Sequence, residues 1–155
     1  DYHFSYKYLP ERAHLDVTEK RFVKLPNKLD IIYREAVRAF NTRLYILCAA
    51  GLRALIEGIC TDKQLVGHTL EKKIELLKNL LPENIVKNLH SFRFMGNDAV
   101  HELTAPNETE LRVAIEVCED LLNYLYDLDY KSSKLVSSRP RDGIKLEEGS
   151  DEGQK

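Results

Sequence analysis

The feature that most constrains the fold is the segment 44–60, which is apolar on nearly every side when drawn as a helix. Only Arg53 and Glu57 carry charge within it. A helix that is apolar all round lies at the centre of a domain, because its neighbours must cover every face. Its longest uninterrupted apolar run, 44–52, is far shorter than the roughly 20 residues that a membrane span needs. The segment therefore predicts a central helix within a bundle and no membrane partner.

Helical periodicity on both sides of this segment supplies the covering helices. Apolar residues recur at helical spacing over 28–40, 70–81, from Pro82 towards residue 101, and from 108 to about 128. Pro82 suits a helix start, and Asn107 with Glu110 has the pattern of a capping box. Because the connections are short, neighbouring helices are expected to be antiparallel. The prediction is an all-α antiparallel helical bundle of four main helices plus a shorter one, 70–81.

Composition divides the chain into three parts. Residues 1–24 mix aromatic and charged side chains without helical periodicity, and 20–24 alternate weakly, like a short edge strand. Residues 25–130 carry the periodic stripes, and at 43% hydrophobic the 155-residue chain can fill one core. Residues 131–155 are rich in Ser, Gly, Lys, Glu and Asp, and cannot bury enough surface to offset the entropy of ordering. We expect an irregular N-terminal segment, one helical domain and a disordered C-terminal tail.

Charge and cysteine usage narrow the functional classes. The net charge is only −2, so any nucleic-acid role must rest on a local basic patch. Cys48, Cys60 and Cys118 are isolated in apolar contexts and read as buried core residues of a reducing, cytoplasmic compartment. Spacing of the histidines, cysteines and carboxylates predicts no metal site and no cofactor. The chain begins at Asp1 rather than Met, as expected of a processed protein or a piece of a longer one.

Candidate chemistry gathers in residues 91–102, where Arg93, Asn97 and His101 follow one another at four-residue spacing. On a helix each step drifts only about 40° around the axis, so the three side chains share one surface. Arg can hold a phosphate oxygen bidentately, and His can move a proton near neutral pH, which suits a phosphodiester substrate. The alternative is that His101 is a structural histidine stabilised by the dipole at a helix end.

Two further features bear on this face. Gly96 costs roughly 1 kcal/mol relative to Ala inside a helix, which predicts a close contact with another helix, a ligand or a partner subunit. Arg53 and Glu57 lie four residues apart in the most apolar helix, so we expect a salt bridge between them or with Arg93, Asp98 or His101. The pair either fixes the core or positions the Arg93/His101 face. Arg53, Glu57, Asp98 and Glu102 are the supporting residues of the candidate site.

Several motifs, taken in order, resemble a known family. They are Leu25-Pro26, 32–36 (IYREA), 50–60 (AGLRALIEGIC), 70–74 (LEKKI), and Arg93 to His101 with Gly96-Asn97. Over about residues 25–128 the chain resembles the bacterial domain of unknown function 4145 (DUF4145). That family is similar to the HEPN superfamily of small helical bundles, which commonly dimerise and include metal-independent ribonucleases of toxin–antitoxin and phage-defence systems. In those nucleases an Arg and a His on one helix, with four to six residues between them, meet their symmetry mates across the dimer.

The resemblance supports two hypotheses. In the first, the chain is a metal-independent RNA endonuclease in which Arg93, Asn97 and His101 are catalytic, although seven residues separate Arg93 from His101 here. In the second, it is a non-catalytic dimerisation or recognition module of a larger defence or restriction assembly. Both predict a homodimer with a contact at Gly96, and the partners expected are RNA or a defence-system protein.

Overall fold

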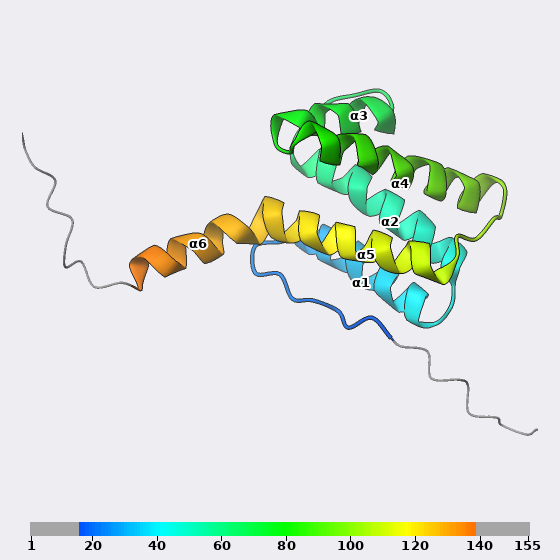
Figure 1. Ribbon diagram of the computed structural model, residues 1–155, viewed down its shortest axis with the longest axis horizontal. Helices are drawn as coiled ribbons and strands as arrows, with labels where there is room; N and C mark the ends of the chain where they lie inside the picture. The colour runs from blue at the N-terminus through cyan, green and yellow to red at the C-terminus, as the bar shows by residue number, and fades with distance from the viewer. Residues whose placement is uncertain (1–15, 139–155) are drawn as a thin grey trace, which may run out of the picture.

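The structure is a computed structural model that describes residues 16–138, and every regular element in that range is a helix (Figure 1). The five predicted helices are present and a sixth follows them. Their bounds are α1 Asn27–Asn41, α2 Tyr45–Asp62, α3 Leu70–Leu76 with the 3₁₀ turn η1 Leu77–Asn79, α4 Glu83–His101, α5 Glu108–Leu122, the π-helical turn η2 Asn123–Asp127, and α6 Leu128–Ser137. The prediction of an all-α bundle is confirmed.

α2 is the centre of the bundle, as its all-round apolar sequence predicted. It packs against α1, α3, α4 and α5, and Figure 1 shows α1 and α4 running antiparallel to it. Gly51 allows a close approach of α1, because a Cβ atom at this position would lie 3.2 Å from the Cβ of Ala36. The largest fully buried side chains come from α1, α2, α3 with η1, α4 and α5: Tyr33, Phe40, Leu52, Leu55, Ile56, Ile59, Ile74, Leu77, Leu89, Leu111, Ile115 and Leu122.

Local signals fix the helix starts. The side chain of Asn107 accepts a hydrogen bond from the Glu110 amide (2.9 Å), while the Glu110 carboxylate accepts one from the Asn107 amide (3.1 Å). This capping box was predicted and is confirmed. Thr69 caps α3 by accepting from the Lys72 amide at 3.3 Å. Pro82 stands immediately before α4, where its missing amide proton costs no helical hydrogen bond.

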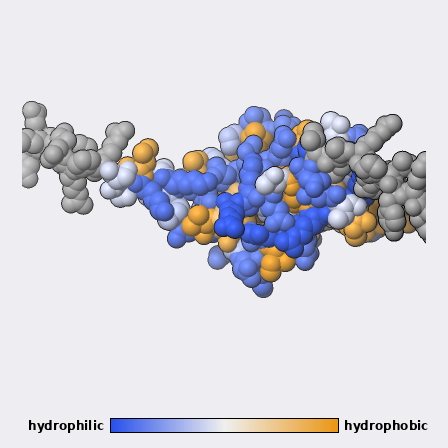
Figure 2. Space-filling view, turned by 90° about the horizontal axis from the view of Figure 1, so that it is seen from below, coloured by the Kyte–Doolittle hydropathy of each residue, from blue (hydrophilic) through white to orange (hydrophobic). Residues whose placement is uncertain are grey.

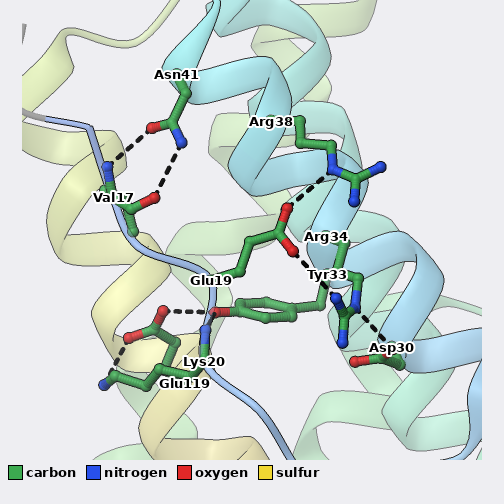
Figure 3. A network of polar contacts seen from close by, with 9 residues as sticks. All are labelled: Val17, Glu19, Lys20, Asp30, Tyr33, Arg34, Arg38, Asn41 and Glu119. Carbon is green, nitrogen blue, oxygen red and sulfur yellow. Dashed lines mark hydrogen bonds and ion pairs between the residues drawn. The ribbon is translucent and has the colours of Figure 1, made fainter.

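Residues 16–26, which precede α1, form a strap across α1 and α5 rather than an edge strand, so the strand predicted over 20–24 is wrong. Figure 3 shows the polar contacts that hold this strap. The buried carboxylate of Glu119 accepts a hydrogen bond from the Tyr33 hydroxyl (2.7 Å) and pairs with Lys20 (Nζ–Oε2 2.6 Å). Residues 1–15 of the predicted irregular segment lie outside the described residues.

The strap also reaches the C-terminal end of α5 through Asp127. This carboxylate is fully buried and accepts hydrogen bonds from the amides of Val23 (2.9 and 3.0 Å) and Lys24 (2.8 Å). Burial acts to raise the pKa of Asp127, but these amides and the nearby Lys131 outweigh it, so the pKa lies below the ordinary value. A charged Asp127 therefore ties the strap to η2.

Helical structure continues beyond the predicted end near residue 128. α5 passes through η2 into α6, which projects from the bundle and has no buried residue (Figure 1). The predicted disordered tail is thus wrong for residues 131–137, because poor burial left helix formation to local propensity and to continuity with α5. Residues 139–155, the rest of that tail, lie outside the described residues.

Candidate functional site

α4 presents the three predicted catalytic residues on one side. Arg93, Asn97 and His101 follow at four-residue spacing, and His101 is the last residue of the helix. At 1.5 Å per residue, Arg93 and His101 are about 12 Å apart along the helix axis. A single phosphate group would therefore not lie beside both backbone positions at once, and each side chain must be considered with its own surroundings.

Arg93 is engaged within its own chain. Its Nη1 atom lies 2.6 Å from Oε2 of Glu71 on α3, and the guanidinium centre lies 4.4 Å from the centroid of the Phe94 ring. The Nε atom is buried and has no hydrogen-bond acceptor among residues 16–138. The charge of Arg93 is thus balanced by a carboxylate that the sequence analysis did not include, since Glu71 is 22 residues away.

Gly96 receives the side chain of Arg53. A Cβ atom at Gly96 would lie 2.5 Å from Cδ and 2.6 Å from Cβ of Arg53, closer than side-chain atoms approach one another. The predicted close contact therefore exists, but it joins α4 to α2 of the same chain. Because Gly96 is buried there, the reason for placing a dimer contact at this residue disappears.

The salt bridge predicted for Arg53 is wrong. Glu57 pairs instead with Lys73 on α3 (Nζ–Oε1 3.3 Å), and Arg53 makes no ion pair within residues 16–138. The Nε atom of Arg53 is buried without an acceptor, as is that of Arg93. Glu57 pairs with Lys73 because α3 packs against α2 in the bundle. Helical spacing in the sequence does not reveal that these two helices are neighbours.

The remaining predicted residues occupy the C-terminal end of α4. Asn97 is half-buried, whereas Asp98, His101 and Glu102 are exposed. Within residues 16–138 the side chains of Asn97 and His101 make no hydrogen bond, and the backbone carbonyl of Asp98 accepts from Glu102 and Thr104. The structure thus keeps Asn97 and His101 on a shared surface with Arg93, but joins none of the three directly.

A hollow lies on the opposite side of α4, between α4 and α5. Both helices pack on α2 but make little direct contact with each other, and a groove of about 1150 Å³ remains between them. We call it the α4–α5 groove. Its apolar walls are Ile85, Leu89, Phe92 and Met95 from α4, and Val113, Ala114 and Val117 from α5.

The α4–α5 groove combines apolar walls with an acidic end. Its lining includes Asp98, Glu108 and Glu110 but no Lys or Arg among the described residues. Glu108 forms an ion pair with Arg112 (Nη2–Oε1 3.2 Å), and Glu110 is part of the capping box of α5. Such a groove can accept an amphipathic helix that carries positive charge.

The α4–α5 groove was not predicted from the sequence. A signal was present in Val113 and Val117, which are four residues apart and lie outside the buried stripe of α5. Val113 remains 53% exposed in the bundle and Ile85 36%. Val113 and Val117 lie beside the buried stripe of α5, so they indicate a second apolar face on this helix. Such a face is expected to contact another helix or another molecule.

Nucleophilic and metal chemistry find little support in the described residues. Burial raises the pKa of Cys60 to about 11 and that of Cys48 to about 12, so both thiols stay protonated and unreactive. Within residues 16–138 no three His, Cys, Asp or Glu side chains are placed to hold a metal ion. In the same range, no helix combines the length and hydrophobicity that a membrane crossing requires.

Comparison with known proteins gives one match. The family described as "Domain of unknown function (DUF4145)" matches residues 34–138, a span that runs from α1 to the end of α6. No curated protein and no solved structure matches the chain. The match covers well over half of the 155 residues and contains both the α4 surface and the groove. The chain therefore belongs to the DUF4145 family.

Proposed function

We propose that this domain is a HEPN-like, non-catalytic dimerisation and recognition module of a larger assembly, and that the α4–α5 groove is its docking surface. The observation that carries the proposal is the groove itself, an apolar channel along two helices with nothing from the described chain inside it. Covering a Val or Ile side chain contributes about 1.5–3 kcal/mol when the side chain is fully buried. Ile85, Met95, Val113 and Val117 together make such a contact favourable.

The state of the opposite side of α4 supports the same choice. Arg93 is paired with Glu71, and Arg53 covers Gly96, so the two arginines are used in holding α3 and α4 to the bundle. A catalytic guanidinium has to be available to the transition state, and its structural ion pair would compete with that role. The polar surface therefore serves the fold, and the groove is left to serve a partner.

Sedimentation velocity of the whole chain tests this proposal. At about 50 µM, within the range of weak protein complexes, the wild type should sediment as a dimer. Val113→Asp places a charge in the groove and should give a monomer. Val100→Asp is the matched control, because Val100 is similarly exposed on α4 but does not line the groove. A monomeric wild type, or equal dimerisation of Val113→Asp and wild type, would overturn the proposal.

A metal-independent ribonuclease is the second candidate. It is favoured by the buried Nε atoms of Arg53 on α2 and Arg93 on α4, which have no acceptor within residues 16–138. Asn97 and His101 lie on the same side of α4 as Arg93. In this mechanism His101 takes the proton of a ribose 2′-hydroxyl and the 2′-oxygen attacks phosphorus. The P–O5′ bond breaks, the 5′-oxygen leaves as a hydroxyl with a proton from water, and a 2′,3′-cyclic phosphate remains. Arg93 would stabilise the charge on the phosphorane, with Asn97 orienting the phosphate.

Cleavage of labelled RNA in EDTA separates the two candidates. The docking proposal predicts no cleavage by wild type above that of a mock purification. The nuclease candidate predicts cleavage with cyclic-phosphate ends, reduced by about 10² to 10⁴ in His101→Ala. Arg93→Lys should also be much slower in that case, since a point charge does not reproduce the guanidinium fork.

A further inference from the structure

α6 is an apolar helix surface without a cover. Leu128, Leu135 and Val136 are exposed, and no residue of the helix is buried. Figure 2 shows apolar side chains on the surface of this projecting helix. Leu128 and Leu135 are seven residues apart and share one face, so the exposure forms a stripe rather than scattered residues. An apolar stripe on a helix that leaves its own bundle indicates a contact with another molecule.

The direction of α6 is fixed by the chain itself. Asp127, at the last position of η2, is held by the amides of Val23 and Lys24, and these bonds lock the junction from which α6 departs. The helix therefore points away from the bundle and does not turn back into the groove beside α5 (Figure 1). Among residues 16–138, neither the groove nor the stripe of the same chain has an intramolecular partner.

Exposed or half-buried apolar and aromatic side chains also lie along α5 and η2, before the stripe of α6. Val113, Val117, Tyr124, Leu128 and Leu135 follow at sequence spacings of 4, 7, 4 and 7 residues. In sequence this spacing is that of a helix-pairing seam, and helical structure continues through the π turn η2. Val113 and Val117 form the α5 wall of the groove, whereas Leu128 and Leu135 lie on the projecting part.

From these observations, and resting on the proposed function of the groove, we propose that α6 of a second copy of this chain fills the α4–α5 groove. The two α5–α6 rods pair antiparallel around a twofold axis at Tyr124. Val113 lies 11 residues before Tyr124 and Leu135 lies 11 residues after it, so this arrangement sets Leu135 of one copy beside Val113 of the other. Each copy gives one helix and receives one, as a twofold interface requires.

Length and charge agree with this occupant. The α4 wall runs from Ile85 to Asp98, about 20 Å at 1.5 Å per residue, and the ten residues of α6 extend about 15 Å. α6 carries Lys131 and Lys134 against one acidic residue, while the groove lining carries three carboxylates and, among the described residues, no Lys or Arg. Two reciprocal contacts combine into one interface and double its buried area.

Cysteine cross-linking tests the register. Full-length Val113→Cys and Leu135→Cys chains, mixed and mildly oxidised, should form a covalent dimer that reducing agent dissolves. Tyr124→Cys should cross-link with its own copies, because the axis brings the two residues together. Neither Val113→Cys alone nor Leu135→Cys alone should cross-link, since equal positions lie 22 residues, or about 33 Å, apart along the rods.

Wild type is the background control for this experiment. Cys48, Cys60 and Cys118 are buried, so the unmodified chain should show no covalent dimer. Cross-linking of Val113→Cys with itself would show parallel pairing and overturn the register. Leu135→Asp gives an independent readout and should weaken dimerisation by at least about tenfold, the equivalent of 1.4 kcal/mol. Ser133→Asp, on the other side of α6, should leave dimerisation unchanged.

The outcomes distinguish this inference from the function on which it rests. A dimer that is lost in Val113→Asp but kept in Leu135→Asp, without the mixed cross-link, would overturn the α6 contact and leave the groove as a docking surface. A wild-type monomer would overturn both. Dimerisation lost in both aspartate variants, together with the mixed cross-link, is the result that the inference predicts.

Discussion

The two sides of α4 show what the fold itself satisfies and what it leaves for a partner. On the polar side, Arg93 forms an ion pair with Glu71, and Glu57 forms one with Lys73. The side chain of Arg53 packs against Gly96. On the groove side, Ile85, Phe92 and Met95 face α5 across a space that the described chain does not fill. The charged residues that suggested catalysis thus make contacts that hold the fold together. The apolar residues of the groove are not covered by any described part of the chain. An uncovered surface is the better guide to a binding role here.

The largest expected effect comes from breaking the internal packing of the polar side. Gly96→Leu forces a side chain into the position of Arg53 and should lower the free energy of unfolding by about 3 kcal/mol, the upper end for overpacked cores. Val100→Leu on the same helix should stay within about 0.5 kcal/mol because Val100 is exposed. Urea denaturation of both variants measures the difference. A fully stable Gly96→Leu would show that Gly96 is not an internal contact.

The second effect concerns the junction that directs α6. Asp127→Ala leaves the amides of Val23 and Lys24 without their acceptor and should cost about 2 kcal/mol, within the range for unsatisfied buried groups. Exposed Asp129→Ala is the control and should be nearly neutral. Chemical denaturation compares the two. If Asp127→Ala were as stable as the control, the junction would not be fixed by this carboxylate.

The same carboxylate predicts a pH dependence. The pKa of Asp127 is lower in the folded chain than its ordinary value, so its stabilising contribution is complete at neutral pH. It is lost as the pH falls below the ordinary range of an aspartate, near 4, and through the lowered folded-state pKa. Asp127→Ala should therefore lose less stability between pH 7 and pH 3 than wild type. Equal losses in both chains would contradict this assignment.

Much of the fold could be predicted from sequence because its signals are local. The apolar segment 44–60 predicted the central helix, and the capping-box pattern of Asn107 and Glu110 predicted the start of α5. The pairing of Glu57 with Lys73 instead of Arg53 could not be predicted, because Lys73 comes within reach of Glu57 only once α3 packs on α2. The partners of Asp127 lie more than 100 residues away in the chain.

The candidate site divides in the same way. Helical spacing correctly placed Arg93, Asn97 and His101 on one side of α4. It could not show that Glu71 neutralises Arg93, since that contact depends on how α3 packs. The groove was missed because its width is set by α2, which separates α4 from α5. α6 was not predicted as a helix because its sequence is rich in Ser and Lys, like that of a disordered tail.

The smallest effect on stability is expected from releasing Arg93. Glu71→Gln removes a partly exposed ion pair and should change the free energy of unfolding by less than about 1 kcal/mol. Glu75→Gln, exposed on the same helix, is the control. If the polar side of α4 has no RNA ligand, both variants should bind short labelled RNA as weakly as wild type in fluorescence anisotropy. A higher RNA affinity of Glu71→Gln, but not of Glu75→Gln, would indicate that the polar side of α4 is a functional surface.

Hydrogen exchange at two protein concentrations tests the central claim most directly, namely that the groove side of α4 is the working surface. Exchange is followed by mass spectrometry on the unmodified full chain below and above the dimer dissociation constant. The account predicts that raising the concentration slows exchange in peptides covering α6 and the groove wall of α5, while peptides of α3, on the polar side of α4, change little. Protection that rises over α3 and leaves α6 and α5 unchanged would contradict it.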